Sequence, residues 1–121
     1  MKKINTSVLF VEDEKIVRNA ISEMLRRRVE NLFVAENGKE GLESFKKNKA
    51  EIIITDINMP IIDGLEMLKK IKIINPKSKT IVMSAHSEVK YFLKAIEIGV
   101  DGFLIKPINR KKLFSVYFSQ N

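Results

Sequence analysis

Five short runs of apolar residues divide the chain, and their pattern predicts buried β-strands. Within each run the apolar residues are nearly continuous, as is typical of parallel strands that are covered on both faces of a sheet. The runs are Ser7–Val11, Leu32–Ala35, Ile52–Thr55, Thr80–Met83 and Phe103–Ile105. We therefore expect a sheet of five parallel strands.

Apolar residues recur with the spacing of one helical face after each run, so we expect a helix to follow each strand. The expected apolar faces are, in chain order, Ile16, Val17, Ala20, Ile21, Met24 and Leu25; Leu42 and Phe45; Leu65, Leu68 and Ile71; Val89, Phe92 and Ile96; and Leu113, Val116 and Tyr117. Strands that alternate with helices predict an α/β fold, in which right-handed crossovers place helices on both faces of one parallel sheet.

Polar residues mark where several of these helices begin and end. Asn37 with Glu40, and Asp63 with Glu66, have the spacing of a capping box at the start of a helix. Gly99 can end the fourth helix, because glycine readily adopts the left-handed conformation common after a helix.

The composition excludes several classes of protein. The chain has 121 residues, no cysteine and a single histidine. We expect one domain, over residues 1–121, without disulfides or a cysteine-based zinc site, and one histidine argues against the usual catalytic zinc sites. No apolar run approaches the roughly 18 residues of a membrane span, so we expect a cytoplasmic protein without membrane insertion.

The net charge of +7 is compatible with a nucleic-acid or anionic membrane partner, but the distribution of the basic residues argues against one. The densest basic runs are Arg26–Arg28, Lys46–Lys47 and Lys69–Lys70, each near the end of a predicted helix. Cations there suit the helix dipole and the solvent, and no aromatic residues interleave with them. We expect no direct binding of nucleic acid.

Polar side chains follow four of the five predicted strands. Glu12 and Asp13 follow the first strand, Asp56 the third, Ser84 the fourth and Lys106 the fifth. Sites in open parallel sheets form beyond the carboxyl ends of the strands, so these side chains are expected at one edge. Each of them alone is an ordinary loop or helix-start residue, and it is their joint placement that predicts a site.

Three carboxylates at one edge repel one another unless a cation lies between them. Glu12, Asp13 and Asp56 bring a formal charge of −3, Lys106 brings +1, and one divalent cation would neutralise the sum of −2. Oxygen ligands without histidine or cysteine suit Mg²⁺. A carboxylate beside Mg²⁺ and a lysine can attack phosphorus, because both cations offset the charge on the phosphoryl oxygens.

With these residues in place, the sequence resembles a response regulator receiver domain, the phospho-acceptor module of two-component signalling. The resemblance extends from Val8 to Phe118, and its motifs are Val11–Glu14, Thr55–Pro60 with Asp63–Gly64 behind it, Met83–His86 and Gly102–Pro107. It implies a flavodoxin-like (βα)5 three-layer sandwich with the family's strand order 2-1-3-4-5.

The resemblance also implies roles around a phosphoryl group on Asp56. Mg²⁺ would be held by Asp56, by Asp13, by Glu12 directly or through water, and by the backbone carbonyl of Asn58. The family's members catalyse only their own phosphorylation and dephosphorylation, so we expect no enzyme activity toward other substrates.

The resemblance assigns roles to four further positions. Ser84 would donate a hydrogen bond to one phosphoryl oxygen and Lys106 would pair with another, next to a cis Lys106–Pro107 bond. Phe103 would be the aromatic residue that changes rotamer on activation. His86 lies where the family tunes the lifetime of the acyl phosphate. The alternative is that His86 is an exposed loop residue without a role.

Three residues depart from the family's common pattern. Glu12 replaces the commoner Asp and reaches further, so its metal coordination can differ. Ser84 replaces Thr and leaves more room for the aromatic residue to move inward. Phe103 replaces Tyr and has no hydroxyl group, so the switch would be weaker or would depend on packing alone.

The family's partners follow from the same resemblance. A sensor histidine kinase or phosphotransfer protein would donate the phosphoryl group, and an output partner or an output domain outside this sequence would respond. The output surface, and a candidate homodimer surface, would combine the last two predicted helices with the strand Phe103–Ile105.

The last two helices carry more apolar residues than one face can bury. We expect the fourth helix to bury Val89, Phe92 or Leu93, and Ile96 on the sheet. Tyr91, Ala95 and Ile98 are then expected on another face. The fifth helix adds Leu113, Phe114, Val116, Tyr117 and Phe118 to this surplus. The surplus residues are either buried at the helix ends or form a surface for a partner or a second copy of the chain.

Three other classes of protein fit the sequence less well than a receiver domain does. A metal-dependent phosphatase of the haloacid dehalogenase type uses similar residues, but its nucleophile follows the first strand and its acidic pair comes last. An FMN carrier of the flavodoxin type would have its phosphate repelled by Glu12 and Asp13. A DNA-binding module is not supported either, because no helix-turn-helix follows the receiver pattern in this sequence.

Overall fold

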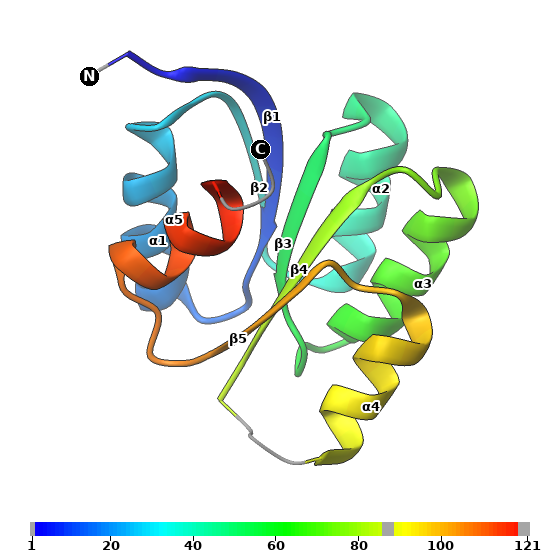
Figure 1. The fold of residues 1–121 in the computed structure, drawn as a ribbon. Helices are drawn as coiled ribbons and strands as arrows, with labels where there is room; N and C mark the ends of the chain where they lie inside the picture. The colour runs from blue at the N-terminus through cyan, green and yellow to red at the C-terminus, as the bar shows by residue number, and fades with distance from the viewer. Residues whose placement is uncertain (1, 86–88, 119–121) are drawn as a thin grey trace.

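A parallel sheet of five strands forms the middle layer of the structure (Figure 1). This computed structural model describes residues 2–85 and 89–118, with side chains as far as residue 115. The strands lie in the order β2-β1-β3-β4-β5, as the family resemblance implied. Their bounds are β1 Ile4–Val11, β2 Val29–Ala35, β3 Ile52–Asp56, β4 Lys79–Ser84 and β5 Gly102–Ile105.

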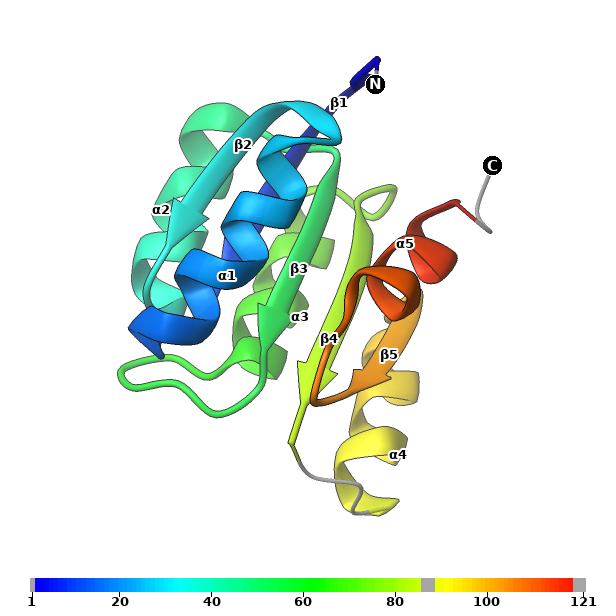
Figure 2. The ribbon, with the colours of Figure 1, turned by 90° about the vertical axis from the view of Figure 1, so that its left-hand side faces the viewer.

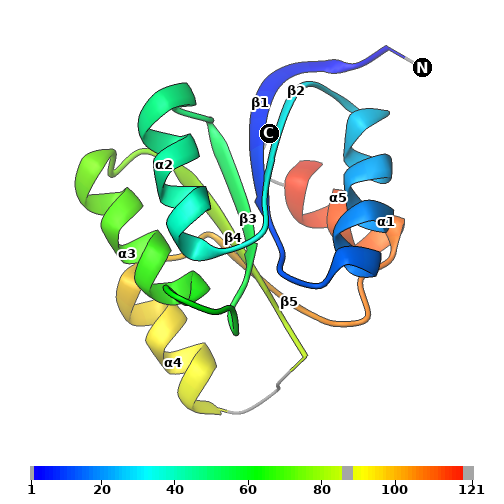
Figure 3. The same cartoon turned by 180° about the vertical axis from the view of Figure 1, so that it is seen from behind.

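Helices cover both faces of this sheet. Their bounds are α1 Lys15–Arg26, α2 Gly38–Asn48, α3 Gly64–Ile74, α4 Val89–Ile98 and α5 Arg110–Phe118. α1 and α5 lie on one face, and α2, α3 and α4 lie on the other (Figure 3). The α/β sandwich predicted from the sequence is therefore confirmed. In the described part of the chain, no helix combines the length and apolar character that crossing a membrane requires.

The nearly continuous apolar runs arise because the sheet is buried on both sides. Val8 and Phe10 of β1 pack into the core on the α1 and α5 side, whereas Leu9 and Val11 pack into the core under α2 and α3. Successive side chains of a strand point to opposite faces, so a strand covered on both faces needs apolar residues at every position.

The predicted helix boundaries are confirmed by their hydrogen bonds. The backbone N–H of Glu40 donates to Asn37 Oδ1 over 2.8 Å, and that of Glu66 donates to Asp63 Oδ1 over 2.8 Å. Gly99 follows α4 with a φ of +89°, a left-handed conformation that glycine adopts without steric cost.

The apolar face expected for α1 is wider than the face that the helix buries. Ile21 and Leu25 are buried, and Val17 and Met24 are half-buried, whereas Ile16 is 85% exposed and Ala20 is exposed. A helix packed on a sheet buries only an arc of its circumference, and Ile16 and Ala20 lie beyond the edge of that arc.

The face of α4 that was expected on the sheet is exposed, so this prediction was wrong. Ala95 is buried and Tyr91 and Ile98 pack against the core. The other stripe stays exposed, and its members are Val89, Phe92, Leu93 and Ile96. Both stripes have helical spacing, and the one with the small Ala95 lets the helix backbone approach its neighbours closely. Leu113 and Phe114 of α5 are buried, and the side chains of residues 116–118 lie outside the description.

Candidate functional site

The pairing of β1 with β3 brings two acidic residues to the same level of the sheet. Val11 lies opposite Thr55, so Glu12 and Asp56 are the next residues of two neighbouring parallel strands. The chain then turns closely behind Asp56, because a Cβ atom on Gly64 would lie 1.8 Å from the Asp56 carbonyl oxygen. Only glycine allows the start of α3 to approach the end of β3 in this way.

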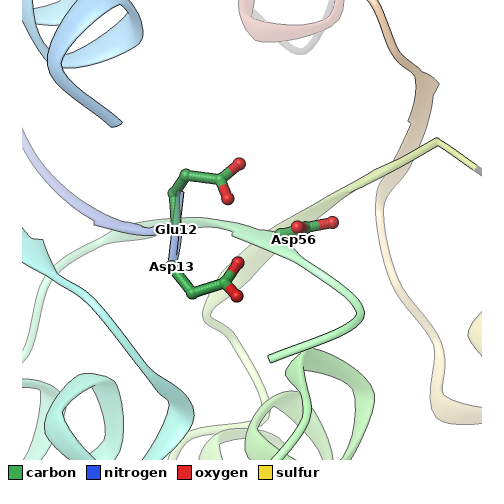
Figure 4. A group of neighbouring side chains, drawn as sticks. All are labelled: Glu12, Asp13 and Asp56. Carbon is green, nitrogen blue, oxygen red and sulfur yellow. The ribbon is translucent and has the colours of Figure 1, made fainter. Parts of the chain in front are cut away.

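Glu12, Asp13 and Asp56 form a carboxylate cluster at this edge, which we call the acidic site (Figure 4). One oxygen of each side chain lies within 4.8 Å of those of the other two. Glu12 is 0% exposed and Asp56 is 7% exposed, whereas Asp13 is half-buried. The cluster therefore combines two enclosed carboxylates with one that reaches the surface.

Lys106 supplies the nearest positive charge. Its Nζ atom lies 2.8 Å from Glu12 Oε1 and 3.2 Å from Asp56 Oδ2, and its side chain is largely buried. The backbone N–H of Lys106 donates to the carbonyl of Ser84 over 2.8 Å, which fixes the end of β5 against the end of β4. The Lys106–Pro107 bond is cis, as the resemblance implied.

Backbone groups hold the remaining oxygens of the two buried carboxylates. The N–H of Glu14 donates to Glu12 Oε2 over 3.1 Å, and the N–H of Ile57 donates to Asp56 Oδ1 over 2.8 Å. Both oxygens of Glu12 thus have partners within the protein. Among the described residues, the Asp13 carboxylate has no such hydrogen bond, which leaves it available to a ligand.

The buried charges shift two protonation equilibria. Burial raises the pKa of Glu12, and the hydrogen bond from Lys106 offsets this only in part. Burial lowers the pKa of Lys106, but the hydrogen bond to Glu12 and the charge of Asp56 outweigh it, so this pKa is raised above its ordinary value. Lys106 is therefore a firmly protonated cation at the acidic site.

The residues of the acidic site fit a hard divalent cation. The three carboxylates and Lys106 sum to a formal charge of −2, because −3 and +1 are combined. Carboxylate oxygens from two loops, one of them open to the surface, match the ligands that Mg²⁺ takes while it keeps several waters.

The other predicted site residues lie around this cluster. Ser84 is buried at the end of β4, and Asn58 is exposed in the loop after β3. Phe103 is half-buried, and its ring meets that of Phe92 edge-on, with 5.7 Å between the ring centroids. His86 lies outside the described residues, so its predicted role stays a prediction.

Arg18 of α1 belongs to the site, although the sequence pattern did not single it out. Its Nη1 atom donates to the carbonyl oxygens of Glu12 over 3.0 Å and of Asp13 over 3.2 Å. Its Nη2 atom lies 3.5 Å from Glu36 at the end of β2. Arg18 therefore fixes the backbone that carries both acidic residues, and the available signal in the sequence was an arginine five residues after the acidic pair.

Comparison with known proteins identifies the family. A model of the response regulator receiver domain matches residues 8–117. The chemotaxis protein CheY of Halobacterium salinarum is 33% identical over 103 residues, which cover 85% of this chain and 86% of that protein. The N-terminal domain of an uncharacterized protein from Wolinella succinogenes is 41% identical, with a TM-score of 0.89 over 94% of this chain and 92% of that one.

Several relatives are much longer than this chain. The uncharacterized transcriptional regulatory protein YesN of Bacillus subtilis is 32% identical over 111 residues, which are 89% of this chain but 30% of that protein. The chain likewise spans 28% of a cyclic di-GMP phosphodiesterase from Thermotoga maritima. Proteins of this family are signalling components with a phosphorylated aspartate and Mg²⁺ as general features. The match over residues 8–117, on a sheet that carries the acidic site at its carboxyl edge, shows that the chain belongs to the response regulator receiver domains of two-component systems.

Proposed function

We propose that residues 1–121 act as one receiver domain that accepts a phosphoryl group on Asp56 from a histidine kinase or a phosphotransfer protein. The observation that carries this proposal is the position of the Asp56 carboxylate, which lies within 4.8 Å of the Glu12 and Asp13 carboxylates and 3.2 Å from Lys106. The response would be a change in the surface formed by α4, β5 and α5.

Asp56 is better suited than its neighbours to be the acceptor. Glu12 is fully enclosed, and both of its oxygens already accept hydrogen bonds. Asp13 is half-buried and available to a metal ion. Asp56 has one oxygen fixed by the Ile57 N–H, which orients the second oxygen toward the group that carries the counter-charge. A carboxylate held in this way is preorganised to attack phosphorus.

The transfer exchanges one bond to phosphorus for another. An oxygen of Asp56 forms a bond to phosphorus while the bond from phosphorus to the donor's imidazole nitrogen breaks, so the electron pair of that bond leaves with the imidazole. Lys106 would lie beside the transferred group and offset its charge. Mg²⁺, held by Asp13, Asp56, the Asn58 carbonyl and Glu12 directly or through water, would supply further neutralisation of the phosphoryl oxygens.

Phosphorylation changes the charge at the site, which gives it a means of signalling. With Mg²⁺ the formal charge is zero before transfer, and afterwards Glu12 and Asp13 give −2, the phosphoryl group −2, Lys106 +1 and Mg²⁺ +2, a sum of −1. We propose that Ser84 then donates to a phosphoryl oxygen and that Phe103 changes rotamer.

The exposed stripe of α4 is the candidate output or homodimer surface. Val89, Phe92, Leu93 and Ile96 are between 49% and 67% exposed, and Ile105 of β5 is exposed as well. The edge-on contact of Phe92 with Phe103 connects this stripe to β5, the strand that leads to Lys106. An apolar stripe on a helix is an efficient surface for a protein partner.

The proposal is tested by incubating the protein with Mg²⁺ and acetyl phosphate and measuring its intact mass. We expect the gain of one phosphoryl group in the wild type and none in Asp56→Asn. Asp63→Asn is the matched control, because Asn caps a helix as well as Asp does and Asp63 is exposed seven residues further along. Equal modification of Asp56→Asn and the wild type would overturn the proposal.

A further inference from the structure

Ile61, in the loop between β3 and α3, has a backbone conformation that its side chain disfavours. Its φ is +73°, in the left-handed region, and the N–H of Ile62 donates to the carbonyl of Pro60 over 2.9 Å. A hydrogen bond between residues two apart around a positive φ is the pattern of the classic γ-turn, which is rare and strained. A β-branched residue at its centre is a true outlier.

The residues on either side impose this turn. Met59 and Ile62 are half-buried against the core under α2 and α3. The carbonyl of Ile62 also lies against Gly38, where a Cβ atom would approach it to 2.1 Å. The loop is thus fixed before and after Ile61, and the left-handed conformation is the geometry that joins the two fixed points.

The side chain of Ile61 is little buried by the part of the chain that the structure describes. It is 71% exposed, so it contributes little burial to offset the strain at its backbone. Glycine would adopt the same turn without strain, and Asn tolerates it. Neither the turn nor the packing explains an isoleucine at this position, whereas contact with another molecule does.

The position of the loop indicates which molecule that is. The loops that follow β1 and β3 leave the sheet at the same end, and this end carries the acidic site (Figure 2). A protein that passes a phosphoryl group to Asp56 must cover this end, because the reacting atoms have to approach to about 3–3.5 Å. Ile61 follows Asp56 by five residues in this loop and exposes an apolar side chain that such a protein can contact.

We propose that Ile61 is an apolar recognition residue for the protein that donates the phosphoryl group to Asp56. This inference rests on the proposed function and deepens it. The partner is a phosphohistidine-bearing protein with an apolar patch next to its phosphorylated side chain, and small phosphodonors have no use for Ile61.

The test compares protein and small-molecule donors on the same variants. Histidine kinase cores encoded in the source genome are autophosphorylated with labelled ATP, and the core that labels the wild type fastest serves as the protein donor. Transfer rates from this core and from acetyl phosphate are measured for the wild type, Ile61→Gly, Ile61→Asn and Ile61→Ala. The control is Ile73→Ala, because Ile73 is 76% exposed near the far end of α3.

For Ile61→Gly and Ile61→Asn we expect the ratio of the kinase rate to the acetyl phosphate rate to fall tenfold or more. The melting temperature should rise by about 2–5 °C in both, because the strain is relieved. Ile61→Ala should lower the ratio without this rise, and Ile73→Ala should leave the ratio unchanged.

An unchanged ratio in all three Ile61 variants would overturn the inference. If the wild type is a dimer in light scattering and these variants lose it while the ratio stays unchanged, the contact belongs to a second copy of the chain, and the inference is likewise overturned. Failure of acetyl phosphate to modify the wild type at all would instead overturn the proposed function on which the inference rests.

Discussion

Lys106 makes its shorter ion pair with Glu12 and not with Asp56. Nζ lies 2.8 Å from Glu12 Oε1 and 3.2 Å from Asp56 Oδ2. In this unphosphorylated arrangement the fully buried Glu12 is the main anchor of the lysine. A phosphoryl group on Asp56 would offer Lys106 a doubly charged partner. The phosphoryl group and the Glu12 carboxylate would then compete for the same ammonium group.

Removal of the lysine should slow the phosphorylation of Asp56. In Lys106→Ala we expect Asp56 to be phosphorylated by acetyl phosphate about tenfold more slowly or worse, because one of the groups that offset the phosphoryl charge is lost. A time course of intact mass measures this rate, and Lys111→Ala, which changes an exposed lysine of α5, is the control. A Lys106→Ala rate equal to that of the wild type would contradict the role given to this residue.

Affinity for Mg²⁺ should depend more on Asp13 than on Glu12. Both Glu12 oxygens accept hydrogen bonds from Lys106 and Glu14, whereas Asp13 is half-buried and has no such contacts among the described residues. We expect Asp13→Ala to weaken binding tenfold or more and Glu12→Ala to weaken it less. Titration with Mg²⁺ followed by NMR decides, and negligible effects of both changes would argue against the metal site.

The contact between Phe92 and Phe103 should transmit the signal to α4. Beryllofluoride with Mg²⁺ mimics the phosphoryl group, and we expect it to shift backbone NMR signals in α4 and β5 as well as beside Asp56. Phe92→Ala should diminish the α4 shifts, whereas Leu93→Ala, on the same exposed stripe, should not. Coupling of this kind is typically about 1–3 kcal/mol. Shifts confined to the loops around Asp56 in the wild type would mean that α4 is not the output surface.

A buried hydroxyl group of α1 offers a test of stability that is independent of the acidic site. Ser22 is buried, and its Oγ has no hydrogen-bond partner among the described residues. Ser22→Ala should therefore raise the free energy of unfolding by about 1–2 kcal/mol, since an unsatisfied group is removed and alanine favours the helix. Ser44→Ala on α2 is the control, because Ser44 Oγ accepts a hydrogen bond from Asn48. Urea denaturation measures both, and a lower midpoint for Ser22→Ala would contradict the expectation.

The strands and the acidic site were predictable because both depend on local rules. A strand buried on both faces requires an uninterrupted apolar run, as Val8 to Val11 shows. The carboxyl ends of parallel strands share one edge, so residues that follow β1, β3 and β5 meet there whatever the details of packing. Glu12, Asp56 and Lys106 are in contact for this reason.

The packing of α4 could not be predicted in the same way. Its sequence contains two apolar stripes, one with Phe92 and one with Ala95, and helical periodicity shows both without ranking them. Which stripe is buried depends on how closely the backbone of α4 can approach its neighbours. That approach is decided by the size of Ala95 and not by the hydrophobicity of the larger residues.

Contacts of long side chains and backbone angles were also beyond the sequence pattern. Arg18 reaches back from α1 to two carbonyl oxygens that precede the helix, and such a contact leaves no periodic trace. The positive φ of Ile61 is imposed by how Met59 and Ile62 are fixed against the core. Both features depend on tertiary structure, which the local pattern does not contain.

Asp56, and no other carboxylate of the acidic site, should receive the phosphoryl group. Borohydride reduces an aspartyl phosphate to homoserine and so marks the modified residue permanently. After incubation with Mg²⁺ and acetyl phosphate, reduction and peptide mass mapping should place homoserine at position 56 and leave Asp13 and Glu12 intact. Homoserine at position 13, or a reduced peptide in Asp56→Asn as abundant as in the wild type, would contradict the assignment of Asp56 as the acceptor.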